Sequence, residues 1–246
     1  MTHLSVNLNK MALLRNSRDI NVPDVAVMGR RCLVAGAFGL TIHPRPDQRH
    51  AKYSDIVSLQ QVVQEFPGSE LNIEGYPTDT FMKHVLEAKP HQCTLVPDEP
   101  GQLTSDHGWP VAKHKELLSR ILGDLKNAGI RSSLFMDVDS IQEYQLAKDL
   151  GADRIELYTE PYALAFGTDK HESMLAQYAE AAKAAIACGL EVNAGHDLNL
   201  TNVGALCSSA PIVEVSIGHA LTVECFDYGL EGTIERYLNI LSDSTA

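Results

Sequence analysis

Three side chains suited to proton transfer stand at or beside the ends of short apolar segments of this sequence. His43 ends the segment GLTIH, Glu74 lies in ELNIEG, and His196 directly follows EVNAG. Histidine exchanges protons near neutral pH, and a partly buried glutamate can be tuned to act as a base. If the segments converge, these residues predict a multi-step acid–base catalyst. The alternative for His43 is a hydrogen bond to a phosphate or to the backbone.

Polar or ionisable residues stand at the ends of all eight such segments. Because the carboxyl ends of parallel strands meet at one face, we expect these side chains to surround a common site. A barrel interior is expected to hold mainly bulky apolar side chains, so polar groups at its mouth cost stability. Each residue alone could merely cap a strand or a helix. In chain order they include Asn7, Asn9, Lys10, His43, Arg45, Glu74, Thr104, Ser105, His107, Asp137, Asp139, Glu156, Glu160, His196, Asp197 and His219.

Basic residues follow the first two segments and suggest a handle for phosphate. Arg45, Arg49 and His50 cluster after the second segment, and Arg15 and Arg18 follow the first. Guanidinium groups match the geometry of phosphate oxygens. The alternative is a solvated charged loop, which is the commoner fate of such strings.

A second phosphate position is expected at the short turns after the seventh and eighth segments. These turns hold Gly195-His196-Asp197 and Gly218-His219. Barrels often bind phosphate there through backbone N–H groups and a helix N-terminus. Two phosphate positions would imply two phosphorylated substrates or one bisphosphate.

Neither a metal nor a nucleotide cofactor is expected. The sequence has no H-E-x-x-H motif, no Walker A loop and no G-x-G-x-x-G fingerprint. Several residues at the segment ends could in principle assemble a metal site. They are His43, His50, His196, Asp197 and His219.

Strand-like and helix-like segments alternate along the whole chain and predict a TIM (β/α)8 barrel. An open doubly wound sheet is the alternative, but it usually has fewer strands at this length. The expected strands are 4–8, 39–43, 70–75, 92–97, 131–137, 154–159, 191–195 and 212–218. The expected helices are 23–35, 54–66, 78–89, 113–128, 140–150, 172–188, 201–208 and 223–241. Long polar loops are expected at 9–22, 44–53, 98–112 and 160–171, of which 98–112 is the candidate lid.

The bulk properties fit one domain over residues 1–246. The net charge of -12 argues against partners such as nucleic acid or an anionic membrane. The five cysteines are scattered without a C-x-x-C pair, as in a cytoplasmic protein with reduced thiols. No signal peptide and no long apolar span are visible.

Six sequence strings resemble the pyridoxine 5'-phosphate synthase family. The resemblance runs in order through essentially the whole chain. The strings are VNLNKMALLRNSR at 6–18, TIHPRPDQRH at 41–50, LNIEG at 71–75, CTLVP at 93–97, VNAGHDL at 192–198 and SIGHA at 216–220.

The resemblance implies condensation of 1-deoxy-D-xylulose 5-phosphate with 3-amino-2-oxopropyl phosphate. It implies a barrel with extra helices, a homo-octamer, and no cofactor. It also implies His43 and Glu74 as proton acceptors, His196 as proton donor and Glu156 as transition-state stabiliser. The substrate-binding residues that it implies are Asn7, Asn9, Lys10, Arg18, Arg45, His50, Thr104, Asp197, Gly218 and His219.

The chain departs from the family pattern at three places. A frequent Asp-His pair after the first strand is Asn9-Lys10, and a glycine that often follows the VNAGH histidine is Asp197. The string ELYTEPY replaces a commoner H-T-G version. A carboxylate repels phosphate, so any phosphate contact at Asp197 must come from its backbone. Two rivals stay open, a different phosphosugar barrel enzyme and a non-catalytic phosphate-ligand-binding barrel.

Overall fold

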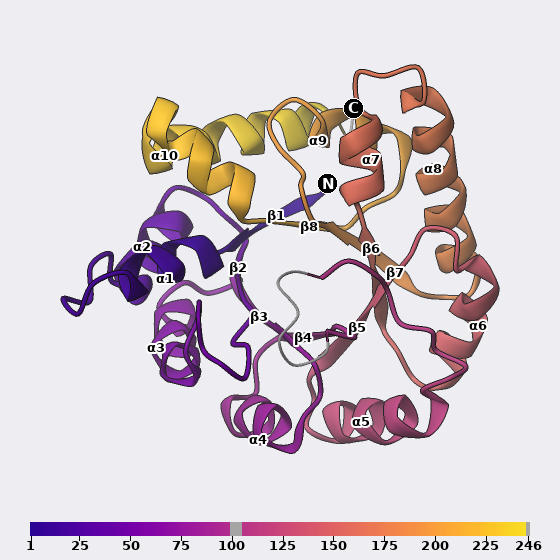
Figure 1. Cartoon of the computed structure of the whole chain (residues 1–246), viewed down its shortest axis with the longest axis horizontal. Helices are drawn as coiled ribbons and strands as arrows, with labels where there is room; N and C mark the ends of the chain where they lie inside the picture. The colour runs from indigo at the N-terminus through magenta and orange to yellow at the C-terminus, as the bar shows by residue number, and fades with distance from the viewer. Residues whose placement is uncertain (99–104, 245–246) are drawn as a thin grey trace.

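The computed structural model describes residues 1–98 and 105–244, and its parallel strands close into one barrel in chain order (Figure 1). The expected fold class is therefore confirmed. Each strand pairs with its neighbours in sequence, and β8 pairs with β1 to close the sheet. The strands are β1 His3–Asn7, β2 Gly39–Ile42, β3 Glu70–Gly75, β4 Gln92–Leu95, β5 Arg131–Met136, β6 Arg154–Tyr158, β7 Glu191–Gly195 and β8 Glu214–Ile217.

Helices surround the barrel and bury their apolar faces against it (Figure 1). Within the described ranges, no helix is both long enough and apolar enough to cross a membrane. The helices are α1 Asn9–Asn16, α2 Val25–Val34, α3 Tyr53–Gln64, α4 Asp79–Ala88, α5 Lys115–Asn127, α6 Ile141–Asp149, α7 Glu160–Ala165, α8 His171–Ala187, α9 Val203–Ser209 and α10 His219–Asp243.

Two segments that were expected to be loops contain helices. α1 lies within 9–22 and α7 within 160–171, so these parts of the loop prediction are wrong. Both helices are short and give little periodicity to read. Tertiary contacts hold them instead: Met11 is buried on α1, and the Tyr162 hydroxyl on α7 donates to the Asn202 carbonyl at 2.6 Å.

The last helix also differs from its expected range of 223–241. It begins directly after β8 at His219 and bends at Gly229, where φ is 70°. Only glycine adopts such a conformation without strain, so Gly229 lets one continuous segment turn along the barrel. The early start of α10 places His219 at the mouth of the barrel.

Polar side chains fill much of the barrel interior, contrary to the expected bulky apolar filling. The Ser5 and Thr41 hydroxyls hydrogen-bond at 2.7 Å, and Gln92 Nε2 of β4 donates across the lumen to Glu214 Oε1 of β8 at 3.2 Å. Alternate residues such as Leu4 and Val6 are fully buried and belong to the core cluster shared with the helices. The hydrogen bonds offset the cost of burying the polar groups.

Ion pairs join strands at the opposite end of the barrel. Arg131 pairs with Glu70, and Arg154 pairs with Glu191 at 2.7 Å and with Glu214 at 3.4 Å. All five are the first residues of their strands, so these pairs tie β3, β5, β6, β7 and β8 together at their starting edge. The floor of the barrel is thus charged but internally paired.

Candidate active site

A cavity of about 380 Å³ opens at the carboxyl ends of the strands. It brings together side chains from both halves of the chain, including the proposed proton acceptors and the proposed proton donor. The convergence on which the sequence hypothesis depended is therefore present. The predicted site residues that line the cavity are Asn7, Asn9, Lys10, His43, Arg45, His50, Glu74, Glu156, His196, Asp197, Gly218 and His219.

Two buried glutamates face this cavity from opposite sides of the barrel. Glu74 on β3 is 8% exposed and Glu156 on β6 is 4% exposed. Burial, then the negative charges of Asp98 and Glu214, raise the pKa of Glu74 to about 8. Burial, then the charges of Glu74 and Glu214, raise the pKa of Glu156 well above its ordinary value. Both can therefore hold a proton near neutral pH.

The loop after β1 positions two catalytic candidates. The Asn9 backbone N–H donates to Asn7 Oδ1 at 3.0 Å, which turns the Asn7 amide nitrogen toward Glu74 Oε2 at 3.4 Å. Asn9 Oδ1 accepts the backbone N–H of His43 at 2.9 Å. Accepting that bond requires only an oxygen, which the asparagine at this departure from the family pattern still supplies.

The β2 side of the cavity is cationic and keeps its histidines neutral. Burial, then the charge of Arg45, lowers the pKa of His43 well below its ordinary value. Burial, then the charge of Lys10, lowers the pKa of His50 to about 4. Neutral His43 can accept a proton, while Lys10 and Arg45 provide the positive charge that an anionic substrate needs.

Arg45 is held in place by a buried carboxylate. Its Nη2 donates to Asp98 Oδ2 at 2.5 Å, and the Ser105 hydroxyl donates to the same oxygen at 2.8 Å. Arg45 and Asp98 are both largely buried. This pair fixes one edge of the guanidinium and leaves its position well defined at the cavity wall.

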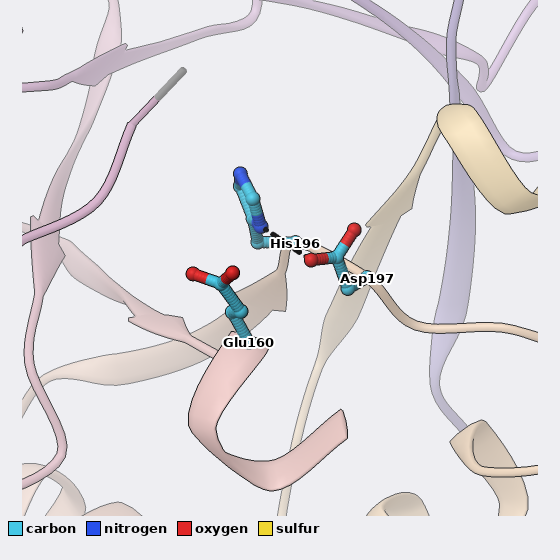
Figure 2. Close-up of side chains that lie close together, drawn as sticks. All are labelled: Glu160, His196 and Asp197. Atoms are coloured by element: carbon cyan, nitrogen blue, oxygen red, sulfur yellow. Dashed lines mark hydrogen bonds and ion pairs between the residues drawn. The ribbon is translucent and has the colours of Figure 1, made fainter. Parts of the chain in front are cut away.

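The β6 and β7 side of the cavity is acidic (Figure 2). Glu160, His196 and Asp197 each offer a ligand atom, and these atoms all lie within 4.8 Å of one another. His196 Nδ1 contacts Asp197 Oδ2 at 3.2 Å, and the imidazole packs edge-on against the Tyr158 ring at 5.1 Å. Glu160 accepts a hydrogen bond from the Tyr158 hydroxyl. Two carboxylates thus flank the proposed proton donor.

The backbone at this turn has positive φ angles, which glycine adopts more readily than other residues. His196 has φ of 93° and Asp197 has φ of 58°. Glycine reaches this region most readily, while aspartate tolerates it. The Asp197 carboxylate also has a lowered pKa, chiefly because of its hydrogen bond with His196. It is therefore a fixed negative charge at a position where the sequence predicted phosphate.

One described substrate-binding candidate, Arg18, is not brought into this cavity. Arg18 lines a separate cavity of about 1020 Å³ beside α1, together with Arg15, Leu14 and Phe226. Thr104 lies outside the described residues. Within the candidate lid, the described part around Trp109 is anchored: the indole is 1% exposed and donates to the Leu95 carbonyl at 2.8 Å.

Sequence reasoning missed several polar residues of the site. Ser216 lines the cavity, and Asn72 and Thr94 lie buried beneath it. The signal was present: in each case a polar residue occurs two positions from another polar residue on the same strand, such as Asn72 and Glu74. A period of two places both side chains on the same face of the sheet.

Comparison with known proteins gives one consistent result. The sequence model of the family "Pyridoxal phosphate biosynthesis protein PdxJ" matches residues 4–243. A pyridoxine 5'-phosphate synthase of Chelativorans sp. (strain BNC1) is 49% identical over 240 residues, covering 96% of this chain and 97% of its own. One of Agrobacterium fabrum is 50% identical over 238 residues, covering 95% of each chain.

Solved structures share the fold at much lower identity. A 3-keto-L-gulonate-6-phosphate decarboxylase from Vibrio cholerae superposes with a TM-score of 0.64 at 11% identity, covering 99% of this chain and 96% of its own. An aldolase described as 4-hydroxy-2-oxoglutarate aldolase/2-deydro-3-deoxyphosphogluconate aldolase gives a TM-score of 0.61 at 11% identity, covering 97% and 93%. These likenesses extend to the barrel alone.

Proposed function

The chain belongs to the family of pyridoxal phosphate biosynthesis protein PdxJ and is an enzyme of vitamin B6 biosynthesis, and we propose how its cavity makes pyridoxine 5'-phosphate. The substrates are 3-amino-2-oxopropyl phosphate and 1-deoxy-D-xylulose 5-phosphate. The products are pyridoxine 5'-phosphate, inorganic phosphate and water. The observation that carries this proposal is the convergence of His43, Glu74 and His196 on one cavity.

The cationic side of the cavity receives the deoxyxylulose phosphate. Lys10, Arg45 and His50 line this side, and Thr104, outside the described residues, completes the proposed set. The pair with Asp98 presets the Arg45 guanidinium, so less conformational entropy is lost when phosphate binds. The charge of Lys10 replaces any positive charge that a histidine at this position would contribute.

The amino-ketone phosphate occupies the opposite side. Asn7 and Asn9 line the cavity between the two ends, and Gly218 and His219 begin α10. The N-terminus of that helix supplies backbone N–H groups for a phosphate. Asp197 contributes through its backbone, since its carboxylate repels an anion. The Glu160 carboxylate suits the ammonium group of this substrate.

Proton transfers drive the condensation. The substrate amine adds to the ketone, water and phosphate leave, and ring closure requires further proton removal. His43 is neutral and can accept a proton, and Glu74 can accept one in its ionised form, which becomes the major form above its pKa of about 8. His196 donates a proton to a departing oxygen, and Glu156 hydrogen-bonds the developing charge. The eight strands contain no lysine, which disfavours a Schiff-base aldolase mechanism.

The test is turnover of the two substrates together. Pyridoxine phosphate absorbance and released phosphate are measured for the wild type, for Glu74→Gln and for the surface control Glu87→Gln. We expect both products from the wild type and the control, and a loss of about a hundredfold or more in Glu74→Gln. Intact substrate binding without any turnover in the wild type would favour the non-catalytic reading.

The oligomeric state is a separate part of the proposal. Leu13, Leu14 and Phe226 are exposed at 42%, 54% and 83%, and they line the cavity that holds Arg18. Exposed apolar residues beside a large cavity fit an interface between copies, which agrees with the homo-octamer that the family resemblance implies. Light scattering of the wild type and of Phe226→Asp tests this, and a monomeric wild type would contradict it.

The remaining expectations fit the same picture. We propose one domain over residues 1–246 that works in the cytoplasm on small phosphorylated substrates, without nucleic acid or membrane partners. The cysteines that support a reducing compartment are free: Cys32, Cys93, Cys188, Cys207 and Cys225. Fractionation of cells that produce the protein tests the compartment.

A further inference from the structure

A line of hydrogen bonds crosses the barrel interior between the two buried glutamates. Asn72 Nδ2 donates to Glu74 Oε1 at 3.4 Å. The Thr94 hydroxyl lies 3.1 Å from Asn72 Oδ1 and 3.4 Å from Glu156 Oε2. Asn72 is 3% exposed and Thr94 is fully buried, and neither lines the cavity. They connect the glutamates from below.

We propose that Asn72 and Thr94 are positioning residues that retain a proton on Glu156 and leave Glu74 as the carboxylate that acts as base. This inference rests on the proposed function, and it assigns different roles to the two acids. Glu74 removes protons from the substrates. Glu156 donates a hydrogen bond as a neutral acid.

Hydrogen-bond donors around Glu74 offset part of the burial cost that raises its pKa. Asn7 Nδ2 faces Oε2, and its orientation is fixed because Asn7 Oδ1 already accepts the Asn9 N–H. Asn72 Nδ2 faces Oε1, and Ser216 donates a further hydrogen bond. A carboxylate that accepts several hydrogen bonds is stabilised relative to the acid. In contrast, the described partner of Glu156 is the single hydroxyl of Thr94.

The Thr94 hydroxyl has a single hydrogen, which sets the direction of the hydrogen bonds between the two glutamates. The hydroxyl oxygen is closer to Asn72 Oδ1, which can only accept. When Thr94 donates there, its oxygen can only accept from Glu156, which must then carry the proton. The reverse arrangement requires a flipped Asn72 amide, a protonated Glu74 and an ionised Glu156. The two arrangements cannot coexist, so these hydrogen bonds couple the protonation states of Glu74 and Glu156.

Charged groups around the pair fit one negative charge rather than two. Glu74 is surrounded by Asp98, Glu214 and the compensating Arg45. Glu156 is close to Glu74 and Glu214, and the causes given for its shift include no cation. Ionising both glutamates would place like charges in a buried space. Of the two glutamates, Glu74 is therefore the one that ionises first as the pH rises.

Substitution of Thr94 tests the direction of the hydrogen bonds between the two glutamates. Thr94→Val removes the hydroxyl at nearly constant volume, and Thr94→Ser keeps it as the matched control. We expect the acid limb of the kcat/KM profile to move to higher pH in Thr94→Val, because Glu74 loses part of its stabilisation as a carboxylate. On that limb kcat/KM falls about threefold to tenfold, since one pKa unit corresponds to a factor of ten. Above the limb, KM stays unchanged.

The opposite outcomes are equally definite. A shift to lower pH means that Thr94 normally stabilises an ionised Glu156, which overturns the proposal. A lower rate at every pH without a shift means that Thr94 only supports packing, which also overturns it. If Thr94→Val fails to fold, Asn72→Leu interrupts the same chain and is expected to move the limb in the same direction.

Infrared spectra of the free enzyme separate this inference from the proposed activity. We expect the C=O stretch of a buried carboxylic acid that persists at pH 9. It should disappear in Glu156→Gln and remain in Glu74→Gln. A band lost only in Glu74→Gln overturns the proposal, whether or not the enzyme makes pyridoxine phosphate.

Discussion

Gly195 lies directly against the carboxylate of Glu156. A Cβ atom at position 195 would overlap Glu156 Oε1, because β6 and β7 are adjacent and their side chains share the barrel interior. The absence of a side chain on β7 thus creates the space that the Glu156 carboxyl group occupies. This relationship links a strand glycine to the position of a catalytic candidate.

Gly195→Ala is expected to lower kcat about a hundredfold, because it displaces the Glu156 carboxyl group by about an ångström. The matched control is Gly123→Ala on α5, where a Cβ atom would meet no atom within 4 Å. That control should keep full activity and gain up to about 1 kcal/mol of stability as a helix substitution. Steady-state kinetics and denaturant unfolding measure both effects. Wild-type activity in Gly195→Ala would show that Glu156 tolerates displacement.

Asp197→Gly is expected to strengthen the binding of the amino-ketone phosphate about fivefold, because it removes a fixed negative charge from the phosphate side of the cavity. The positive φ of 58° suits glycine, so the turn keeps its shape. Substrate titration at low and high salt measures the effect, which screening should reduce. Weaker binding in this variant would instead indicate that the carboxylate contacts the substrate ammonium group.

Chelation is expected to leave activity unchanged, since the proposed chemistry uses only protein acids and bases. Added Zn²⁺ is expected to inhibit, because Glu160, His196 and Asp197 offer ligand atoms within 4.8 Å of one another. Glu160→Gln should weaken that inhibition at least severalfold, and Glu172→Gln on the surface of α8 is its control. Loss of activity with a chelator, restored by a metal, would contradict the expectation that no metal is needed.

The stability of the fold is expected to fall as the pH decreases from about 6.5 to about 4. The pKa of His50 is about 4 in the folded chain, against an ordinary value of 6.5. In this window the unfolded chain binds a proton that the folded chain does not, so the free energy of unfolding decreases with decreasing pH. His50→Asn should lose less stability across the window. Urea unfolding at pH 6.5 and 4.5 measures this, and an unchanged slope would contradict it.

Much of the architecture could be predicted from the sequence, because short strand-like segments alternate along the chain with helix-length segments. The eight strand-like segments and the main helices therefore stood out. The short helices α1 and α7 could not be predicted, since burial of Met11 and Tyr162 against distant segments holds them. Length and periodicity carry no information about such contacts.

The candidate site also has residues that could be predicted from the sequence and residues that could not. His43, Glu74, Glu156 and His196 could be identified as polar groups at or near strand ends, and the cavity brings them together. The buried link through Asn72 could not be identified, because it depends on the stagger between β3, β4 and β6. Arg18 illustrates the reverse, since its motif predicted a place in the site and the fold directs it to another cavity.

The paired charges of Glu70, Arg131, Arg154, Glu191 and Glu214 lie at the starting edge of the strands, opposite the cavity. The cavity opens at the carboxyl ends of the strands, so we expect substrates to enter and products to leave on that face. A shared opening would impose an order of product release. A phosphate released deep in the cavity leaves only after the product that lies above it has left.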